Sequence, residues 1–346
     1  MTRRNFHSDN EAGVAPEILA ALARANDGTA RSYGDDAITK RLRARFCEIF
    51  ETELELFPVV TGTAANALAV AQLTPPYGAV YCHAEAHLNT DECGAPELYS
   101  GGAKLIGLEG AHAKIDPAVL EHTLRHAGYL DDHECKACTL SVSQATEHGA
   151  AYSAAELAQL TRIARGYGLR VHMDGARFAN ALVHLGATPA ELTWKSGIDL
   201  LSFGATKNGA MMAEALLVFD SALAVELGRR RKRAGHLPSK MRFVSAQLEA
   251  YLDGGLWLRL ARHANAAAQA IAAGFEGVAG AELLHPVQGN EVFLRLSPAV
   301  AEGLKAAGFG FNRWPRTDDV YRFVAAFDTP SSAVEDLVQA AHRLAR

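Results

Sequence analysis

The sequence has no long apolar run and no strong excess of charge of either sign. None of its 346 residues lie in a stretch approaching the roughly 18–20 apolar residues that a membrane-spanning helix needs. The formal net charge is −5, which does not indicate nucleic acid or an anionic membrane as a partner. Residues 1–9 are polar and basic without an apolar segment, so they are not a secretory signal. We therefore expect a cytoplasmic protein.

Cysteine is also scarce. The five cysteines are Cys47, Cys82, Cys93, Cys135 and Cys138. An odd number without regular spacing is consistent with reduced thiols. Cys135 and Cys138 form a C-x-x-C with His133 nearby, but no fourth ligand for zinc is evident. The motif leads into an apolar run, so we interpret it as two thiols at the entrance of a strand. Since no carboxylate cluster has metal-ligand spacing either, no metal site is predicted.

One local basic run, residues 229–233 (RRRKR), departs from the balanced composition. A helical pattern precedes it, and Gly235 and Pro238 follow it. We interpret it as a solvated helix face or a subunit contact rather than a site for a polyanion.

Helical and strand-like patterns alternate along the chain. The patterns predict strands at 56–60, 79–82, 104–108, 138–142, 169–173, 198–203 and 215–219, with helices including 17–26, 37–50, 153–166 and 177–185. This alternation predicts an α/β fold with a mostly parallel sheet covered on both faces by helices. After residue 256 the pattern changes to a smaller α+β unit. We expect a large domain over residues 1–252, including an N-terminal arm, and a small domain over residues 253–346.

Lys207 and Asp174 are the most informative residues for function. Each follows an apolar strand-like run, and Lys207 lies 33 residues after Asp174. Open α/β sheets bind ligands at the carboxyl ends of their strands. Pyridoxal phosphate (PLP) is a ligand that needs both groups, because its aldehyde forms a Schiff base with lysine and its pyridine nitrogen needs a carboxylate. The pair therefore predicts a PLP site.

Three further positions are candidates for the same site. Gly62 and Thr63 open a predicted helix, whose N-terminus suits a phosphate. Arg177 lies three residues after Asp174, and a basic residue at the positive end of a helix suggests an anionic partner. His87 follows a strand; an imidazole can stack on a heteroaromatic ring and move protons near neutral pH.

At these residues the chain resembles the low-specificity L-threonine aldolases, PLP enzymes of fold type I in the aspartate-aminotransferase-like superfamily. The resemblance covers nearly the whole length. Its landmarks are residues 8–10, 33–36, 61–66, 86–87, 90–97, 144–147, 172–177, 202–209, 239–242 and 321–323. The motif Asp-Gly-Ala-Arg at 174–177 followed by Lys207 is specific to this branch.

The resemblance implies roles position by position. Lys207 would be the Schiff-base lysine and Asp174 the partner of the pyridine nitrogen, with His87 stacked on the ring and Gly62 and Thr63 at the phosphate. Arg177 would contact the cofactor's phenolic oxygen or the substrate carboxylate.

The resemblance also implies residues around the substrate. Ser8 and Arg322 would grip its carboxylate, with Arg313 and Arg316 as nearby competitors of Arg322. His133 would be a second active-site histidine. Tyr33 and Arg242 would reach in from a neighbouring subunit of a dimer or tetramer.

The implied reaction is retro-aldol cleavage of L-threonine, L-allo-threonine and related L-β-hydroxy-α-amino acids to glycine and an aldehyde. The base for the β-hydroxyl would be His133, His87 or a water held between them. Three alternatives stay open: β-elimination or racemisation on the same scaffold, an aldolase tuned to a bulkier substrate such as phenylserine, and a PLP-binding protein without catalysis.

Overall fold

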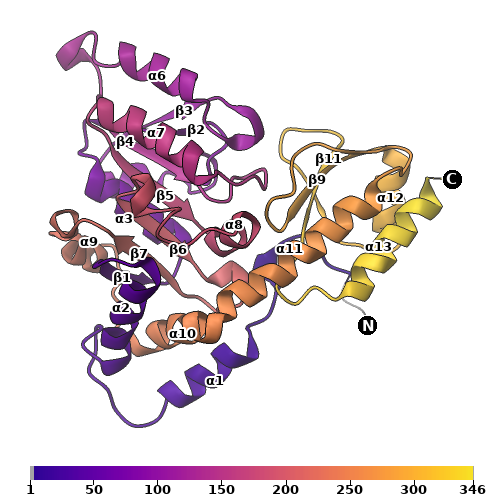
Figure 1. Cartoon of the computed structure of the whole chain (residues 1–346), viewed down its shortest axis with the longest axis horizontal. Helices are drawn as coiled ribbons and strands as arrows, with labels where there is room; N and C mark the ends of the chain where they lie inside the picture. The colour runs from indigo at the N-terminus through magenta and orange to yellow at the C-terminus, as the bar shows by residue number, and fades with distance from the viewer. Residues whose placement is uncertain (1–3, 346) are drawn as a thin grey trace.

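The computed structural model describes residues 4–345, and they contain two sheets (Figure 1). The larger sheet has seven strands in the order β1-β7-β6-β5-β4-β2-β3. Its strands are β1 (Glu55–Val59), β2 (Gly78–His83), β3 (Lys104–Leu108), β4 (Lys136–Ser143), β5 (Arg170–Gly175), β6 (Leu200–Gly204) and β7 (Glu214–Val218). Strands β3, β2, β4, β5 and β6 pair in parallel, whereas β7 and β1 are antiparallel to their neighbours. The predicted mostly parallel sheet is confirmed.

Helices cover both faces of this sheet. The helices of this part of the chain are α1 (Pro16–Ala25), α2 (Ala37–Phe50), α3 (Gly62–Leu73), α4 (His87–Thr90), α5 (Ala95–Ser100), α6 (Pro117–His126), α7 (Ala154–Gly166), α8 (Phe178–Leu185), α9 (Leu227–Arg233) and α10 (Arg242–Leu252). Among them, α1 packs mainly on α10 and α6 mainly on α7. Strands β2, β5, β6 and β7 are buried almost throughout, which explains why most of their residues are apolar. Their buried polar residues, among them Asp174 and Glu214, are the exceptions. Local signals fix the helix starts: Ser153 and Glu156 form a capping box at α7.

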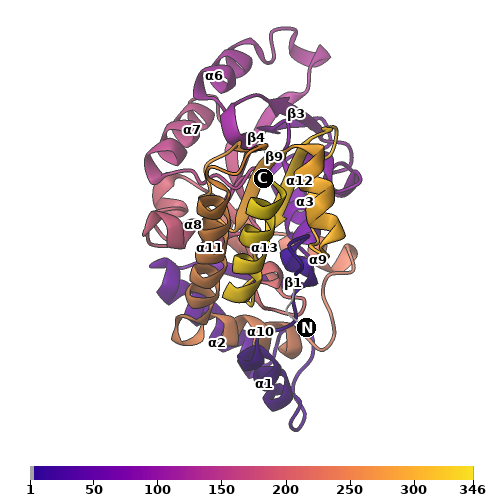
Figure 2. The same ribbon diagram turned by 90° about the vertical axis from the view of Figure 1, so that its right-hand side faces the viewer.

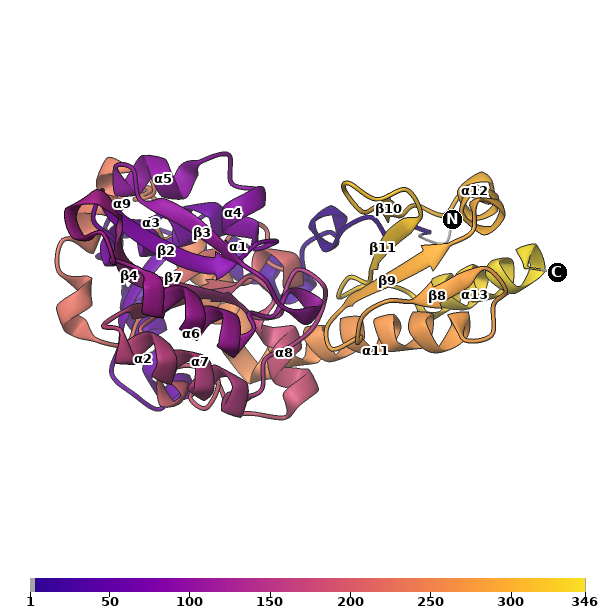
Figure 3. The same ribbon diagram turned by 90° about the horizontal axis from the view of Figure 1, so that it is seen from above.

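The smaller sheet is antiparallel, in the order β10-β11-β9-β8. It consists of β8 (Ala281–Leu283), β9 (Glu291–Leu296), β10 (Asn312–Arg313) and β11 (Val320–Val324), with α12 (Pro298–Ala306) and α13 (Ser331–Leu344). The long helix α11 (Leu256–Phe275) packs against both α8 and α13, and it extends from α8 along the smaller sheet, as seen from above in Figure 3. Figure 2 shows α11 and α13 side by side on the outer face.

The first described residues pack on the smaller sheet. Phe6 donates its N–H to the carbonyl of Gly310 and accepts a bond from Val324, and its side chain is fully buried in the same core as Phe323. From there the chain returns to the larger sheet, where Ala15 bonds to Gly209. The N-terminal arm thus bridges both units, and the domain boundary near residue 252 stays a prediction.

The basic run at residues 229–233 was expected on a solvated helix face or at a subunit contact, but one of its residues points inward. It forms α9, and Arg231 turns inward: its Nη1 donates to the carbonyl of Pro58 at 3.1 Å, and its guanidinium lies over the ring of Phe57. Burial lowers the pKa of Arg231 to about 10. The other four basic residues are at least partly exposed.

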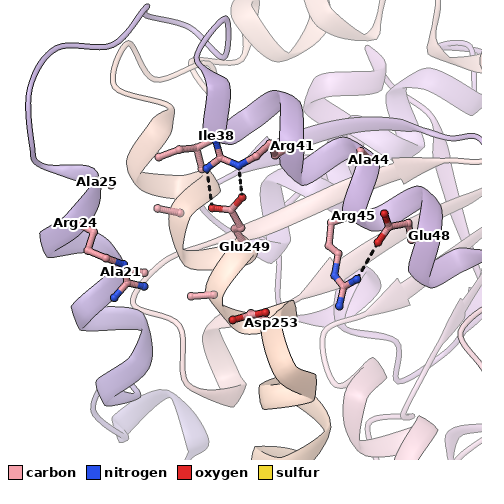
Figure 4. Close-up of a pocket in the computed structure, with 12 residues that line it drawn as sticks. Ala21, Arg24, Ala25, Ile38, Arg41, Ala44, Arg45, Glu48, Glu249 and Asp253 are labelled. Carbon is pink, nitrogen blue, oxygen red and sulfur yellow. Dashed lines mark hydrogen bonds and ion pairs between the residues drawn. The ribbon is translucent and has the colours of Figure 1, made fainter.

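Helices α1, α2 and α10 enclose a surface groove (Figure 4). Alanines such as Ala21, Ala25 and Ala246 line it, and an Arg41–Glu249 ion pair at 3.0 Å crosses its rim. None of the predicted site residues lines this groove, so its apolar wall is separate from the candidate site.

Candidate active site at the strand ends

Asp174 and Lys207 lie at the carboxyl ends of neighbouring parallel strands. Asp174 is in β5, paired in register with Ser202 of β6, and Lys207 is in the short 3₁₀ helix Thr206–Asn208 that follows β6. The Asp174 carboxylate is buried and accepts bonds from the Asn66 amide at 2.8 Å and from the N–H of Ala176 at 3.0 Å. The structure therefore brings a fixed carboxylate and an amine to one edge of the sheet.

His87 belongs to the same network. It begins α4, and its Nδ1 lies 3.0 Å from Oε1 of the buried Glu92. The same Glu92 oxygen accepts from Asn66 Nδ2 at 2.8 Å, so one amide nitrogen joins the carboxylates of Glu92 and Asp174. The bond to Glu92 raises the pKa of His87, with a smaller contribution from Asp174, despite burial and the nearby Lys207. Burial raises the pKa of Glu92.

Helix α3 presents its N-terminus beside this network. Thr61 caps it by accepting the N–H of Ala64 at 3.2 Å, and Asn66 lies in its second turn. Within residues 4–345, nothing accepts a hydrogen bond from the N–H groups of Gly62 or Thr63. A Cβ on Gly62 would meet no atom within 4 Å, so the space in front of this helix end is open. Free N–H groups at a helix N-terminus suit an anion.

Arg177 is held by protein carboxylates. Its Nε and Nη2 donate to the two oxygens of Asp9 at 2.8 and 3.1 Å, and its Nη1 lies 3.4 Å from Glu291. Burial alone would raise the pKa of Asp9, but Arg177, Lys207 and Asn290 lower it overall. Because Asp9 fills the bidentate edge of Arg177, only the Nη1 side of this arginine remains for a ligand.

Arg322 has an edge without a partner. Its Nη1 donates to Oε1 of Glu291 at 3.2 Å, whereas its Nε is buried and has no partner in the described chain. Arg313 and Arg316, the alternative candidates for binding the substrate carboxylate, are both exposed. Arg313 lies on β10, in register with Tyr321 of β11. A buried guanidinium N–H without a partner is costly, which favours Arg322 as the anion-binding arginine.

Ser8 lies at the start of the 3₁₀ helix Asp9–Glu11, which packs against the one that carries Lys207. The Ser8 hydroxyl accepts the N–H of Asn10 at 3.2 Å and keeps its own proton available as a donor.

His133 does not join this group within its own chain. It is exposed in a 3₁₀ helix, Asp131–His133, that precedes β4, whereas Ser143 at the other end of β4 pairs with Asp174. Strands rise about 3.3 Å per residue, so the length of β4 separates His133 from the site by on the order of 25 Å. The structure therefore does not bring His133 to the site of its own chain, and its role in an active site stays a prediction.

Tyr33 and Arg242 lie together, away from Lys207, on an exposed edge of the large unit. Tyr33 is 49% exposed and bonds through its N–H to the carbonyl of Ser239. Arg242 begins α10, and its Nη1 donates to the carbonyl of Gly28 at 3.2 Å. Among residues 4–345, no hydrogen bond or ring contact joins either side chain to Lys207, Asp174 or His87.

Sequence reasoning gave no role to several buried acids of the site. Asp9 and Glu92 lie inside recognised motifs, which is a signal that could have found them; Glu291 and Glu214 lie in none. Burial raises the pKa of Glu214 to about 7, although Thr206, Ala205 and Lys207 lower it. Burial also raises the pKa of Glu147 to about 7; its Oε1 accepts the N–H of His87 at 2.9 Å.

Among residues 4–345, no three His, Cys, Asp or Glu side chains are grouped so as to hold a metal ion. No helix within that part of the chain has the length and apolar character to cross a bilayer. All five cysteines are free, with Cys135 just before β4 and Cys138 inside it, so the C-x-x-C lies at a strand entrance as predicted.

This fold and site define a lyase: the chain belongs to the beta-eliminating lyase family, which matches residues 5–298. It is 44% identical over 335 residues to a low specificity L-threonine aldolase of Pseudomonas sp. (strain NCIMB 10558), covering 96% of each chain. It is 43% identical over 337 residues to the enzyme of the same name from Pseudomonas aeruginosa, covering 97% of this chain and 96% of the relative. A solved threonine aldolase from Leishmania major superposes with a TM-score of 0.93 at 26% identity, covering 99% of this chain and 100% of that one.

Proposed function

We propose that this protein is a PLP-dependent aldehyde-lyase that cleaves L-threonine, L-allo-threonine and related L-β-hydroxy-α-amino acids to glycine and an aldehyde. The observation that carries the proposal is the chain of contacts from His87 through Glu92 and Asn66 to Asp174, beside Lys207. The two Pseudomonas relatives, matched over almost the whole chain, support the reaction. We also expect the protein to act in the cytoplasm.

The residues fit the proposed cofactor. Lys207 supplies the amine, Asp174 a fixed carboxylate, and the open end of α3 at Gly62 and Thr63 the phosphate cradle. Arg177 is available for the phenolic oxygen through its Nη1. When bound, PLP supplies the electron sink that accepts the electron pair of the broken bond.

His87 is the proposed base for the β-hydroxyl. In this role Glu92 accepts a hydrogen bond from the Nδ1–H of the neutral His87 ring, which leaves Nε2 as the proton acceptor. Glu147 holds the backbone N–H of His87 and so fixes where the ring stands. His133 is too far away in its own chain to share this role.

Arg322 and Ser8 are proposed to bind the substrate carboxylate. The unpaired Nε of Arg322 and the hydroxyl of Ser8 are both donors. Fixing the carboxylate would set the orientation of the substrate Cα in the site, and that orientation would decide which of its bonds breaks.

The active site is proposed to be shared between subunits of a homodimer, with a tetramer as the expected assembly. Tyr33 and Arg242 have no role in their own site, and Lys232 lies over the exposed Tyr33 ring at 4.7 Å. This basic and aromatic edge suits contact with the phosphate and substrate of a partner's site.

Product analysis tests the reaction. The purified, PLP-loaded protein is given L-threonine, L-allo-threonine and L-phenylserine separately. Glycine with the matching aldehyde is the expected result, and the rate ratios rank the substrates. Ammonia with a keto acid, or the D-isomer, would move the reaction to elimination or racemisation; bound cofactor without turnover would leave a binding protein.

A further inference from the structure

Glu291 is a buried carboxylate between two arginines of the site. It begins β9, opposite Val324 of β11, and its side chain is 1% exposed. Its Oε1 lies 3.2 Å from Arg322 Nη1 and its Oε2 lies 3.4 Å from Arg177 Nη1. A buried charge is costly to desolvate and persists where opposite charges compensate it.

The arginines are fully compensated without any ligand. Arg177 also holds Asp9, whose side chain is 1% exposed and accepts a further bond from Asn290 at 3.0 Å. Two guanidinium groups and two carboxylates thus form a group with no net charge. A bound substrate carboxylate makes this group negative by one, and a second carboxylate on the same ligand meets no spare positive charge in it.

Arg322 is also fixed in orientation. Glu291 holds its Nη1, and the ring of Trp314 lies 5.4 Å from the centre of its guanidinium. No partner for its buried Nε lies among residues 4–345. One carboxylate of a ligand can therefore bind at the Nε edge of Arg322. Glu291 already occupies the Nη1 side, where another carboxylate would otherwise bind.

We infer that Glu291 is a specificity-determining residue that positions Arg322 for one carboxylate and discriminates against dicarboxylic amino acids. The inference deepens the proposed function and rests on it for the place of the substrate carboxylate. Its physical basis is repulsion: in a partly desolvated site, like charges a few ångströms apart act strongly on each other.

Calorimetric binding to the PLP-loaded protein tests the inference, with glycine and L-aspartate as probes. We expect the wild type to bind aspartate at least about tenfold more weakly than glycine. Glu291→Gln keeps the shape of the side chain and removes its charge, so the ratio should shift toward aspartate by about tenfold or more. Glu291→Asp keeps the charge and should keep the wild-type preference.

The matched control is Glu282→Gln. Glu282 is an acid of the same sheet that is exposed and pairs with Arg295, so the loss of its charge should leave the ratio unchanged. Thermal unfolding shows whether each variant keeps its fold.

Three results would overturn the inference. The first is a Glu291→Gln variant that loses affinity for both ligands equally, which would show that Glu291 only holds the arginines together. The second is a wild type that binds aspartate as tightly as glycine, and this result needs no variant to fold. The third is a wild type that binds neither ligand. Binding requires no cleavage, so a holoenzyme that forms no aldehyde from threonine would contradict the proposed reaction and leave the affinity ratio measurable.

Discussion

Glu214 offers a direct test of how burial sets charge in this site. It begins β7 and pairs in register with Gly204 of β6 and Val59 of β1. Its side chain is buried, and its Oε2 accepts the N–H of Ala205 at 3.0 Å, just before the turn that carries Lys207. Replacing it with glutamine keeps the acceptor oxygen and removes the titration.

The sign of the effect follows from the pKa. Burial raises the pKa of Glu214 from 4.5 to about 7 in the folded protein. The folded state therefore binds this proton more tightly, and the resulting stability is fully present below pH 4.5 and lost as the pH rises through about 7. Between pH 5 and pH 8 the free energy of unfolding of the wild type should fall by roughly 2–3 kcal/mol relative to Glu214→Gln.

Urea unfolding at pH 5, 6.5 and 8, at one protein concentration, measures the difference. The free energy of unfolding of Glu214→Gln should rise steadily relative to that of the wild type as the pH rises. The control is Glu53→Gln, since the Glu53 side chain is 84% exposed and its charge is solvated in both states. If Glu214→Gln and the wild type show the same pH dependence, the carboxyl does not titrate near neutral pH and the reasoning is refuted.

Three further variants test the rest of the site. Lys207→Ala should reduce threonine cleavage below detection and abolish the absorbance of the lysine-bound cofactor; wild-type turnover would contradict its role. Glu92→Gln keeps an acceptor oxygen for His87 Nδ1 but removes the negative charge behind the raised pKa of His87, so the acid limb of the kcat profile should move to lower pH and kcat should fall by about 10- to 100-fold; an unmoved limb would rule out His87 as the titrating base. Gly204→Ala places a Cβ 2.4 Å from the carbonyl oxygen of Ala176, so the free energy of unfolding should fall by roughly 1–3 kcal/mol in thermal unfolding. Unchanged stability would show that the backbone at this strand end can shift without cost.

Much of the fold follows from local sequence patterns. The predicted helix at 37–50 and strand at 104–108 have the same bounds in the structure, and the other predicted strands of the large sheet differ by a few residues at most. Buried parallel strands are short and mostly apolar, whereas helices bury one face and repeat their apolar residues every three to four positions, so the two patterns can be told apart. The meeting of Asp174 and Lys207 then follows from topology, because parallel strands end at the same edge.

His133 shows that a role implied by resemblance does not fix where the chain places the residue. The residues after His133 form β4, which carries the chain from the amino ends of the parallel strands to their carboxyl ends. Sequence distance does not say whether the intervening chain folds back or runs straight. A helix or a turn in the same interval would have returned His133 toward Asp174.

The acids of the site were hidden for a different reason. Asp9 and Arg177 lie 168 residues apart, and Glu291 and Arg322 lie on separate strands. Composition gives the sum of charges, whereas the chemistry depends on which charges are buried together. Asn66 makes the point most clearly: its single amide nitrogen binds Glu92 and Asp174 at once, so it holds two buried carboxylates in fixed positions and couples the ring of His87 to the carboxylate beside Lys207. A neutral side chain with no chemistry of its own thus sets the geometry in which the charged residues act, and this follows only from contacts between distant segments.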